Sequence, residues 1–200
     1  MKLARVYPIV DNAGWISRLA PLGVRLLQLR VKERAAAEVR GEVRAAQALC
    51  AAAGMQLIVN DYWEIALEEG CDFVHLGQGD LAQADLAALR RAGVRLGIST
   101  HDHDELERAL RASPDYIALG PIYPTLLKVM PWQPQGLARL GEWKRRIGTI
   151  PLVAIGGLTL ERLAGIFAAG ADVAAVVTDI ICDRDPEARA RAWLAAASAA

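Results

Sequence analysis

One unit repeats along the chain: an apolar run rich in β-branched residues, a polar loop, and an Ala-, Leu-, Glu- and Arg-rich segment of helical period. Eight of the apolar runs have the length of buried strands: 5–11, 24–30, 55–61, 73–77, 95–100, 116–120, 151–157 and 172–178. Several of the helical segments end on a glycine, a residue suited to the C-terminus of a helix. Eight units predict a closed (β/α)8 TIM barrel of the α/β class, because a doubly wound open sheet usually has five or six strands.

The length and charge of the chain limit what such a barrel can be. Two hundred residues, 54% of them hydrophobic, predict a single domain over 1–200 with a sizeable core. Lys plus Arg and Asp plus Glu both number 23, and this balance argues against nucleic acid or an anionic membrane as the main partner. No apolar run reaches the length of a membrane span, and the N-terminal residues lack a signal-peptide pattern. Three cysteines without a CxxC pair favour reduced thiols, so we expect a cytoplasmic protein. We expect its partners to be small-molecule substrates, and a homodimer is left open.

The segment LQLRVKE at 27–33 carries charge at the end of an otherwise buried strand. Gln28, Arg30 and Lys32 alternate with apolar residues, so their side chains share one face of the strand. In a barrel we expect these three at the C-terminal mouth, where active sites are built, while Leu29 and Val31 pack beneath the helices.

Two carboxylates stand at the ends of neighbouring strands. Asn60 and Asp61 close the third apolar run, and Asp80 follows the fourth. Oxygen ligands that include few carboxylates suit magnesium, which completes its shell with water and substrate phosphates. We therefore expect Asp61 and Asp80 to hold magnesium as a cofactor.

Cations from two separate segments are expected to meet this metal. Arg30 and Lys32 belong to the end of the second strand, and Lys128 follows the sixth. Three cations and a divalent ion suit a diphosphate, particularly one that leaves with growing negative charge. Arg30, Lys32 and Lys128 are therefore the predicted catalytic residues.

Glycines at the end of the seventh apolar run predict a second anion site. Gly156 and Gly157 precede a helical segment, and Val177 and Thr178 end the eighth run. Backbone N–H groups at such a point bind a monophosphate, and barrels often place one after strands 7 and 8. A diphosphate site beside a monophosphate site suggests two phosphorylated substrates.

Each of these residues also has an ordinary structural explanation when it is taken alone. A rim cation commonly forms an ion pair, an aspartate commonly caps a helix, and a glycine pair commonly makes a turn. The fifth run also ends in polar residues, Ser99, Thr100 and His101. The functional interpretation depends on the agreement of seven strand ends on one theme of phosphate and metal.

Three other features favour structural roles. In the HDHD segment, helix capping by Asp102 or Asp104 is favoured over zinc, because adjacent residues do not converge on one metal. His75 is expected to support the carboxylates indirectly. Trp132 and Trp143 are expected to pack against loop and helix.

Nine segments, in their order along the chain, resemble one enzyme family: YPIVD, GVRLLQLRVK, LIVNDYWEIA, VHLGQGDL, LGISTHD, YIALGPIYPT, PQGL, VAIGGL and VAAVVT. Together they are similar to the thiamine phosphate synthases, also called thiamin-phosphate pyrophosphorylases. The resemblance covers almost the whole chain, and NDYW and MPWQPQGL are most similar to the proteobacterial branch.

The resemblance implies a magnesium-dependent transferase that joins hydroxymethylpyrimidine diphosphate to thiazole phosphate and releases pyrophosphate. It implies that Asp61 and Asp80 hold magnesium. The implied pyrimidine diphosphate site comprises Gln28, Leu29, Arg30, Val31, Lys32, Asn60, Ser99 and Lys128. The implied thiazole phosphate site comprises Thr125, Leu126, Leu127, Gly157, Val177 and Thr178.

The chain departs from the family pattern mainly on the thiazole side. Leu127 stands where the family pattern TxTK has a threonine, so any hydrogen bond that this hydroxyl made to substrate is lost, at a cost of about 0.5–1.5 kcal/mol. Asp179 follows Thr178 where a small residue is usual, and its charge would repel a phosphate unless it is turned away or caps the last helix. Gly79 replaces a common acidic residue, although Asp80 is retained.

Two alternative functions are kept beside the synthase. The first is a non-catalytic barrel that binds pyrimidine diphosphate or phosphate. Leu127 and Asp179 are the features in its favour, whereas the intact pair of metal-binding carboxylates favours the enzyme. A thiazole tautomerase is disfavoured, since its acid–base histidine would fall where this chain has Pro121. The proline-rich segment 124–136 is expected to act as a lid over either site.

Overall fold

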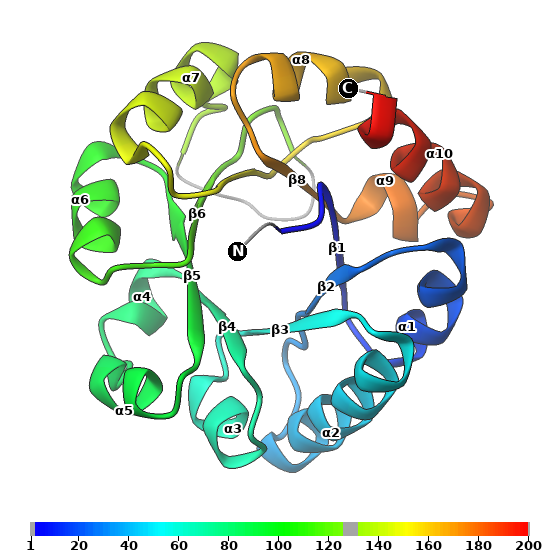
Figure 1. The fold of residues 1–200 in the computed structure, drawn as a ribbon, viewed down its shortest axis with the longest axis vertical. Helices are drawn as coiled ribbons and strands as arrows, with labels where there is room; N and C mark the ends of the chain where they lie inside the picture. Colours follow the sequence, from blue (N-terminus) through cyan, green and yellow to red (C-terminus); the bar gives the residue numbers. More distant parts are fainter. Residues whose placement is uncertain (1–2, 126–131, 200) are drawn as a thin grey trace.

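The computed structural model describes residues 3–125 and 132–199. Eight parallel strands pair in chain order and close into a barrel, with β8 returning to β1 (Figure 1). They are β1 (Val6–Val10), β2 (Leu26–Leu29), β3 (Gln56–Asn60), β4 (Phe73–Leu76), β5 (Arg95–Thr100), β6 (Tyr116–Leu119), β7 (Leu152–Ala154) and β8 (Val173–Val176). The predicted (β/α)8 barrel is confirmed.

Helices surround the barrel as an outer ring (Figure 1). The α-helices are α1 (Gly14–Leu19), α2 (Ala36–Ala53), α3 (Trp63–Glu68), α4 (Gln78–Leu81), α5 (Leu86–Arg91), α6 (His103–Arg111), α7 (Gly136–Ile147), α8 (Leu163–Ala168), α9 (Thr178–Ile181) and α10 (Pro186–Ala199). Two 3₁₀ turns, η1 (Ala20–Leu22) and η2 (Leu160–Arg162), precede β2 and α8. The short α9 directly follows β8, and the longer α10 closes the ring at the C-terminal end of the described chain.

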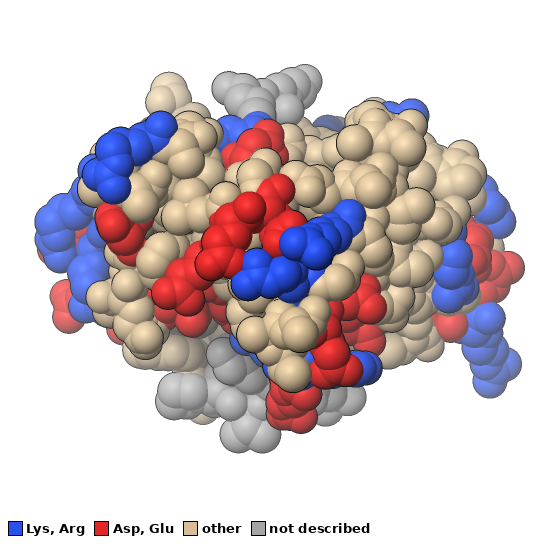
Figure 2. Space-filling view, turned by 90° about the horizontal axis from the view of Figure 1, so that it is seen from below, with Lys and Arg blue, Asp and Glu red and all other residues tan. Residues whose placement is uncertain are grey.

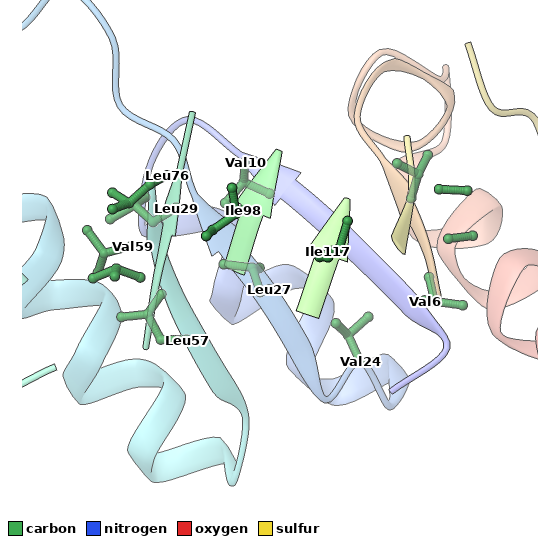
Figure 3. Close-up of a cluster of buried hydrophobic side chains, with 14 of the residues drawn as sticks. Val6, Val10, Val24, Leu27, Leu29, Leu57, Val59, Leu76, Ile98 and Ile117 are labelled. Atoms are coloured by element: carbon green, nitrogen blue, oxygen red, sulfur yellow. The ribbon is translucent and has the colours of Figure 1, made fainter. Parts of the chain in front are cut away.

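Each strand separates two apolar layers, because alternate side chains point to opposite faces. On the outer face, β2 and β3 place Leu27 beside Leu57 and Leu29 beside Val59, and these residues pack beneath the helices (Figure 3). Val31 lies in the same layer, as the alternation in 27–33 predicts. Burying one such leucine completely contributes about 1.5–3 kcal/mol, so this layer is a main source of stability.

The inner layer fills the barrel with large side chains. Tyr7, Leu26, Ile58, Phe73 and Tyr116 are almost completely buried there. The ring of Tyr116 lies over Gly97 of β5, so closely that a Cβ atom at Gly97 would overlap it. Large side chains therefore fill the barrel below its C-terminal mouth.

Charged side chains of both signs are interspersed over the flank of the molecule (Figure 2). This distribution agrees with the balanced composition. Within the described residues, no helix is both long and apolar enough to cross a membrane. Cys50 and Cys71 are buried free thiols, and Cys182 is an exposed one.

Candidate active site

A cavity of about 610 Å³ lies at the C-terminal mouth of the barrel. Its lining includes the following predicted residues: Gln28, Arg30, Lys32, Asn60, Asp61, Asp80, Ser99, Thr125, Gly157, Val177 and Thr178. The side chains of Leu29 and Val31 are buried in the outer layer instead, so only their backbone faces this side of the barrel wall. Leu126, Leu127 and Lys128 lie outside the described residues, as does all of 126–131 within the predicted lid.

A chain of hydrogen bonds forms the floor of the cavity. Gln28 Nε2 donates to the Tyr7 hydroxyl at 2.8 Å, and the hydroxyls of Tyr7 and Tyr116 are 3.0 Å apart. The Tyr116 hydroxyl is 2.7 Å from His75 Nδ1, and His75 Nε2 is 2.8 Å from Ser99 Oγ. Because Gln28 donates at one end, each hydroxyl can donate to the next group, which leaves the Ser99 hydroxyl able to donate into the cavity.

Burial keeps this floor uncharged. It lowers the pKa of His75 to about 4, with Asp61 opposing that shift and Arg30 adding to it. Burial also raises the pKa of both tyrosines, Tyr7 and Tyr116. Near neutral pH the floor therefore offers a ligand neutral hydrogen-bonding groups. The ring of His75 contacts Ser99 and Tyr116, while its backbone carbonyl accepts from the Asp61 N–H.

The side-chain amide of Asn60 lies on the wall above this floor. Its Nδ2 atom is buried and has no hydrogen-bond partner among the described residues. A buried donor left unpaired costs about 1–3 kcal/mol, and its position on the cavity wall leaves this amide available to an acceptor in the cavity.

Charged groups form the rim on the side of β2, β3 and β4. The Arg30 N–H donates to the Val10 carbonyl at 2.8 Å, and the Asp61 N–H donates to the His75 carbonyl at 2.9 Å, so both lie just beyond the ladder of their own strands. Asp61 has a φ of 64°, a left-handed conformation that aspartate tolerates better than most residues. Its carboxylate forms an ion pair with Lys32.

Asp80 faces the same rim from α4. Partial burial and the neighbouring charge of Asp61 raise the pKa of the Asp80 carboxyl, while Lys32 opposes them. Gln78 Nε2 donates to the Ser99 carbonyl at 2.7 Å and thereby fixes α4 against β5. Two carboxylates that repel each other beside a cavity favour a cation between them. Among the described residues, no three His, Cys, Asp or Glu side chains gather as a metal site.

Gly156 and Gly157 shape the opposite rim, after β7. They have φ values of 93° and 65°, which glycine adopts without strain. A Cβ atom at Gly156 would lie 2.6 Å from Pro121, and one at Gly157 would lie 2.9 Å from the Tyr123 carbonyl. The glycine pair is therefore required both for its conformation and for close packing against the segment after β6. The turn that follows it is the short η2 rather than a regular helix.

Several cavity residues were not predicted to be there: Tyr7, Tyr116, Gln78, Glu105 and Trp132. The ring of Trp132 stacks on His101 at a centroid distance of 5.4 Å and lines the cavity. His101 Nδ1 is 2.7 Å from Glu105 Oε2. Trp143, by contrast, packs in the core and donates to Thr100 Oγ1 at 2.8 Å, as its predicted packing role requires. Asp102 caps α6 by accepting from the Glu105 N–H at 2.8 Å, which confirms the predicted cap.

The fold and the cavity together define an enzyme-type (β/α)8 barrel whose charged site lies at the C-terminal mouth. A family model described as thiamine monophosphate synthase matches residues 6–180. The chain belongs to this family, and the family predicted from its motifs is confirmed.

Relatives of the chain carry related names. A thiamine-phosphate synthase of Rhizobium etli is 62% identical over 98% of this chain and 96% of that protein. One from Klebsiella pneumoniae is 47% identical over 97% of this chain and 92% of that protein. The solved structure of a thiamine phosphate pyrophosphorylase from Pyrococcus furiosus has a TM-score of 0.87 at 22% identity, covering 98% of this chain and 96% of that one, and it supports the same fold.

Proposed function

We propose that this protein is a thiamine phosphate synthase, a transferase that joins hydroxymethylpyrimidine diphosphate to thiazole phosphate and releases pyrophosphate. The main support for this proposal is one cavity that combines an uncharged floor, a rim of cations and paired carboxylates, and a second rim of glycines. The names of its relatives support the same reaction.

The pyrimidine diphosphate is assigned to the side formed by β2 to β5. The neutral groups of Gln28 and Ser99 would bind the ring, and the unpaired Asn60 amide would donate to an acceptor of the substrate. Arg30 and Lys32 would bind the diphosphate, because they line the rim above these groups. Lys128 is assigned to the same diphosphate by the family resemblance.

Magnesium fits the rim that Asp61 and Asp80 share. The mutual repulsion of these carboxylates favours a cation, and two carboxylate ligands are typical of magnesium bound together with substrate phosphates. When bound, magnesium would supply positive charge to the departing diphosphate. Lys32, released from its ion pair with Asp61, would then be available to the diphosphate.

The chemical step requires positioning and charge stabilisation. The electron-rich aminopyrimidine expels diphosphate from its exocyclic carbon, and the thiazole nitrogen attacks the resulting cation. Arg30, Lys32 and Lys128 stabilise the leaving group. No general base is needed at the thiazole nitrogen, since this nitrogen carries no proton to remove. The glycine rim at 156–157, with Thr178, orients the nucleophile by binding its phosphate.

The test is pyrophosphate release by the purified protein with magnesium and both substrates, each omitted in turn. Release that requires all three, together with formation of thiamine phosphate, is the expected result. Lys32→Ala is expected to slow release strongly. Lys144→Ala is the matched control, because Lys144 also pairs with an aspartate, Asp172, but lies before β7 and β8 at the other end of the barrel. Binding of the pyrimidine diphosphate without turnover would instead establish the non-catalytic barrel.

A further inference from the structure

Asp179, the residue expected to repel a bound phosphate, is turned away from the cavity. It belongs to the first turn of α9, directly after Thr178, which lines the cavity. Its carboxylate accepts from Arg189 Nε and Nη2, both at 3.0 Å, and from Trp193 Nε1 at 2.6 Å. Arg189 of α10 thus balances the charge of Asp179. Because this carboxylate is turned away from the cavity, a small residue at position 179 is not required to avoid repelling the phosphate.

The same carboxylate also binds the loop that follows β7. Asp179 Oδ2 accepts from the backbone N–H of Leu160 at 3.2 Å. Arg189 reinforces this connection, because its Nη2 also donates to Glu161 Oε1 at 3.1 Å. The turn η2 is therefore attached to α9 and α10 at two successive residues.

These contacts join the parts of the proposed monophosphate site. Leu160 is three residues beyond Gly157, and Asp179 is one residue beyond Thr178. Both loops consequently depend on one carboxylate that is mostly shielded from solvent, with 15% of its side chain exposed. Trp193 is fully buried, so loss of its acceptor would also disturb the packing of α10 beneath these loops.

We propose that Asp179 is a positioning residue for the second substrate: it holds the loops after β7 and β8 at the spacing that binds the phosphate of the thiazole. The proposal rests on the proposed function and specifies which residue, outside the cavity, sets affinity at one of its two subsites. Displacement of either loop weakens phosphate binding on this rim. Among the described residues, the hydrogen-bond partners of the Asp179 carboxylate are Leu160, Arg189 and Trp193, and none of them belongs to the pyrimidine side built on β2 to β5.

A matched control lies at the opposite end of the same strands. Asp172, directly before β8, accepts from Lys144 Nζ at 2.7 Å and from the backbone N–H of Leu152 at 2.8 Å. It therefore also joins a helix cation to the β7 segment, but far from the mouth. Asp172→Ala and Asp179→Ala remove the same type of connection from the two ends of one strand pair.

The experiment measures KM for each substrate in the wild type, Asp179→Ala, Asp179→Asn and Asp172→Ala. We expect Asp179→Ala to raise KM for thiazole phosphate roughly tenfold to a hundredfold, with KM for pyrimidine diphosphate changed less than about twofold. Asp179→Asn, which keeps an acceptor for Trp193 and Leu160, is expected to lie between Asp179→Ala and the wild type. Asp172→Ala is expected to leave both KM values unchanged. Parallel changes in both KM values, or no change in Asp179→Ala, would overturn the proposal.

Binding of inorganic phosphate, followed by calorimetry, separates this proposal from the proposed function. A wild type that makes no thiamine phosphate refutes the proposed function by itself. The positioning role of Asp179 is then decided by phosphate affinity alone. Weaker phosphate binding in Asp179→Ala than in Asp172→Ala supports it, and equal binding in the two variants refutes it. Should Asp179→Ala fail to fold, the same comparison is made with Asp179→Asn.

Discussion

Acidification is expected to destabilise the protein through one side chain, His75. This residue is 8% exposed, and its two ring nitrogens contact Tyr116 and Ser99 on the floor of the cavity. Burial lowers its pKa from an ordinary value of about 6.5 to about 4. In the unfolded chain the ring is in water, so its pKa there returns to about 6.5.

The sign and size of the effect follow from this difference. Between about pH 6.5 and about pH 4 the unfolded chain binds a proton that the folded protein does not, so stability falls as the pH falls. Because each tenfold difference in proton affinity corresponds to about 1.4 kcal/mol, lowering the pH from about 7.5 to about 5 removes about 2 kcal/mol. Above about pH 6.5 the contribution of His75 to stability is complete.

Urea unfolding of the ligand-free protein at these two pH values measures the loss. The free energy of unfolding of the wild type is expected to fall by about 2 kcal/mol more than that of His75→Asn. His103→Asn is the control, because it removes the imidazole of a histidine that is partly exposed rather than buried. The chain has three histidines, so NMR titration of their rings gives an independent check. An equal loss in the wild type and His75→Asn, or a His75 ring that titrates near pH 6.5, would refute the reasoning.

Three further predictions concern the floor and wall of the cavity. Gly97→Ala is expected to destabilise the protein by roughly 1–3 kcal/mol, because the added methyl group overlaps the Tyr116 ring. Its control is Gly41→Ala on the open surface of α2, which should stabilise the protein by about 0.5–1 kcal/mol. Urea midpoints test both. Tyr116→Phe removes a hydroxyl between two buried polar groups and is expected to cost about 1–3 kcal/mol, measured in the same way; an unchanged midpoint would contradict the chain of hydrogen bonds. Asn60→Leu removes an unpaired buried donor, so the ligand-free protein should keep its thermal midpoint while calorimetry shows weaker binding of pyrimidine diphosphate; unchanged binding would contradict a substrate contact at this residue.

The barrel could be predicted from the sequence because eight buried strands alternate with helical segments. The fifth run, 95–100, matches β5 at both ends, but the ends of several other strands could not be predicted, because they depend on local backbone conformation. The third apolar run was extended to Asp61, but β3 ends at Asn60, where the chain turns to a left-handed conformation. The seventh was extended to Gly157, but β7 ends at Ala154, and the positive φ angles of Gly156 and Gly157 do not fit an extended strand.

The charged rim of the cavity could also be predicted, because alternation along one strand is enough to orient Arg30 and Lys32. The floor could not. Tyr7 and Tyr116 are 109 residues apart, and their hydroxyls meet because closure of the barrel brings the inward side chains of β1 and β6 together. The sequence signal that could have found them is a tyrosine on the inward face of a strand, where a hydroxyl needs a partner. Trp132 gives no such signal, since its stacking on His101 depends on the path of a loop.

The cavity places its charges at different depths, and this separation suits the proposed reaction. The deep groups, His75 and the two tyrosines, are kept neutral by burial, and a neutral aminopyrimidine ring can bind them without bringing charge into the barrel. The ionised groups lie at the rim, where Lys32 is 44% exposed and its ion pair with Asp61 costs little to exchange. In the proposed reaction, diphosphate and magnesium take over the partners of this pair, so charge develops on the leaving group where fixed cations already lie. In the proposed reaction the floor would therefore select the ring, and the rim would promote cleavage of the bond to the diphosphate.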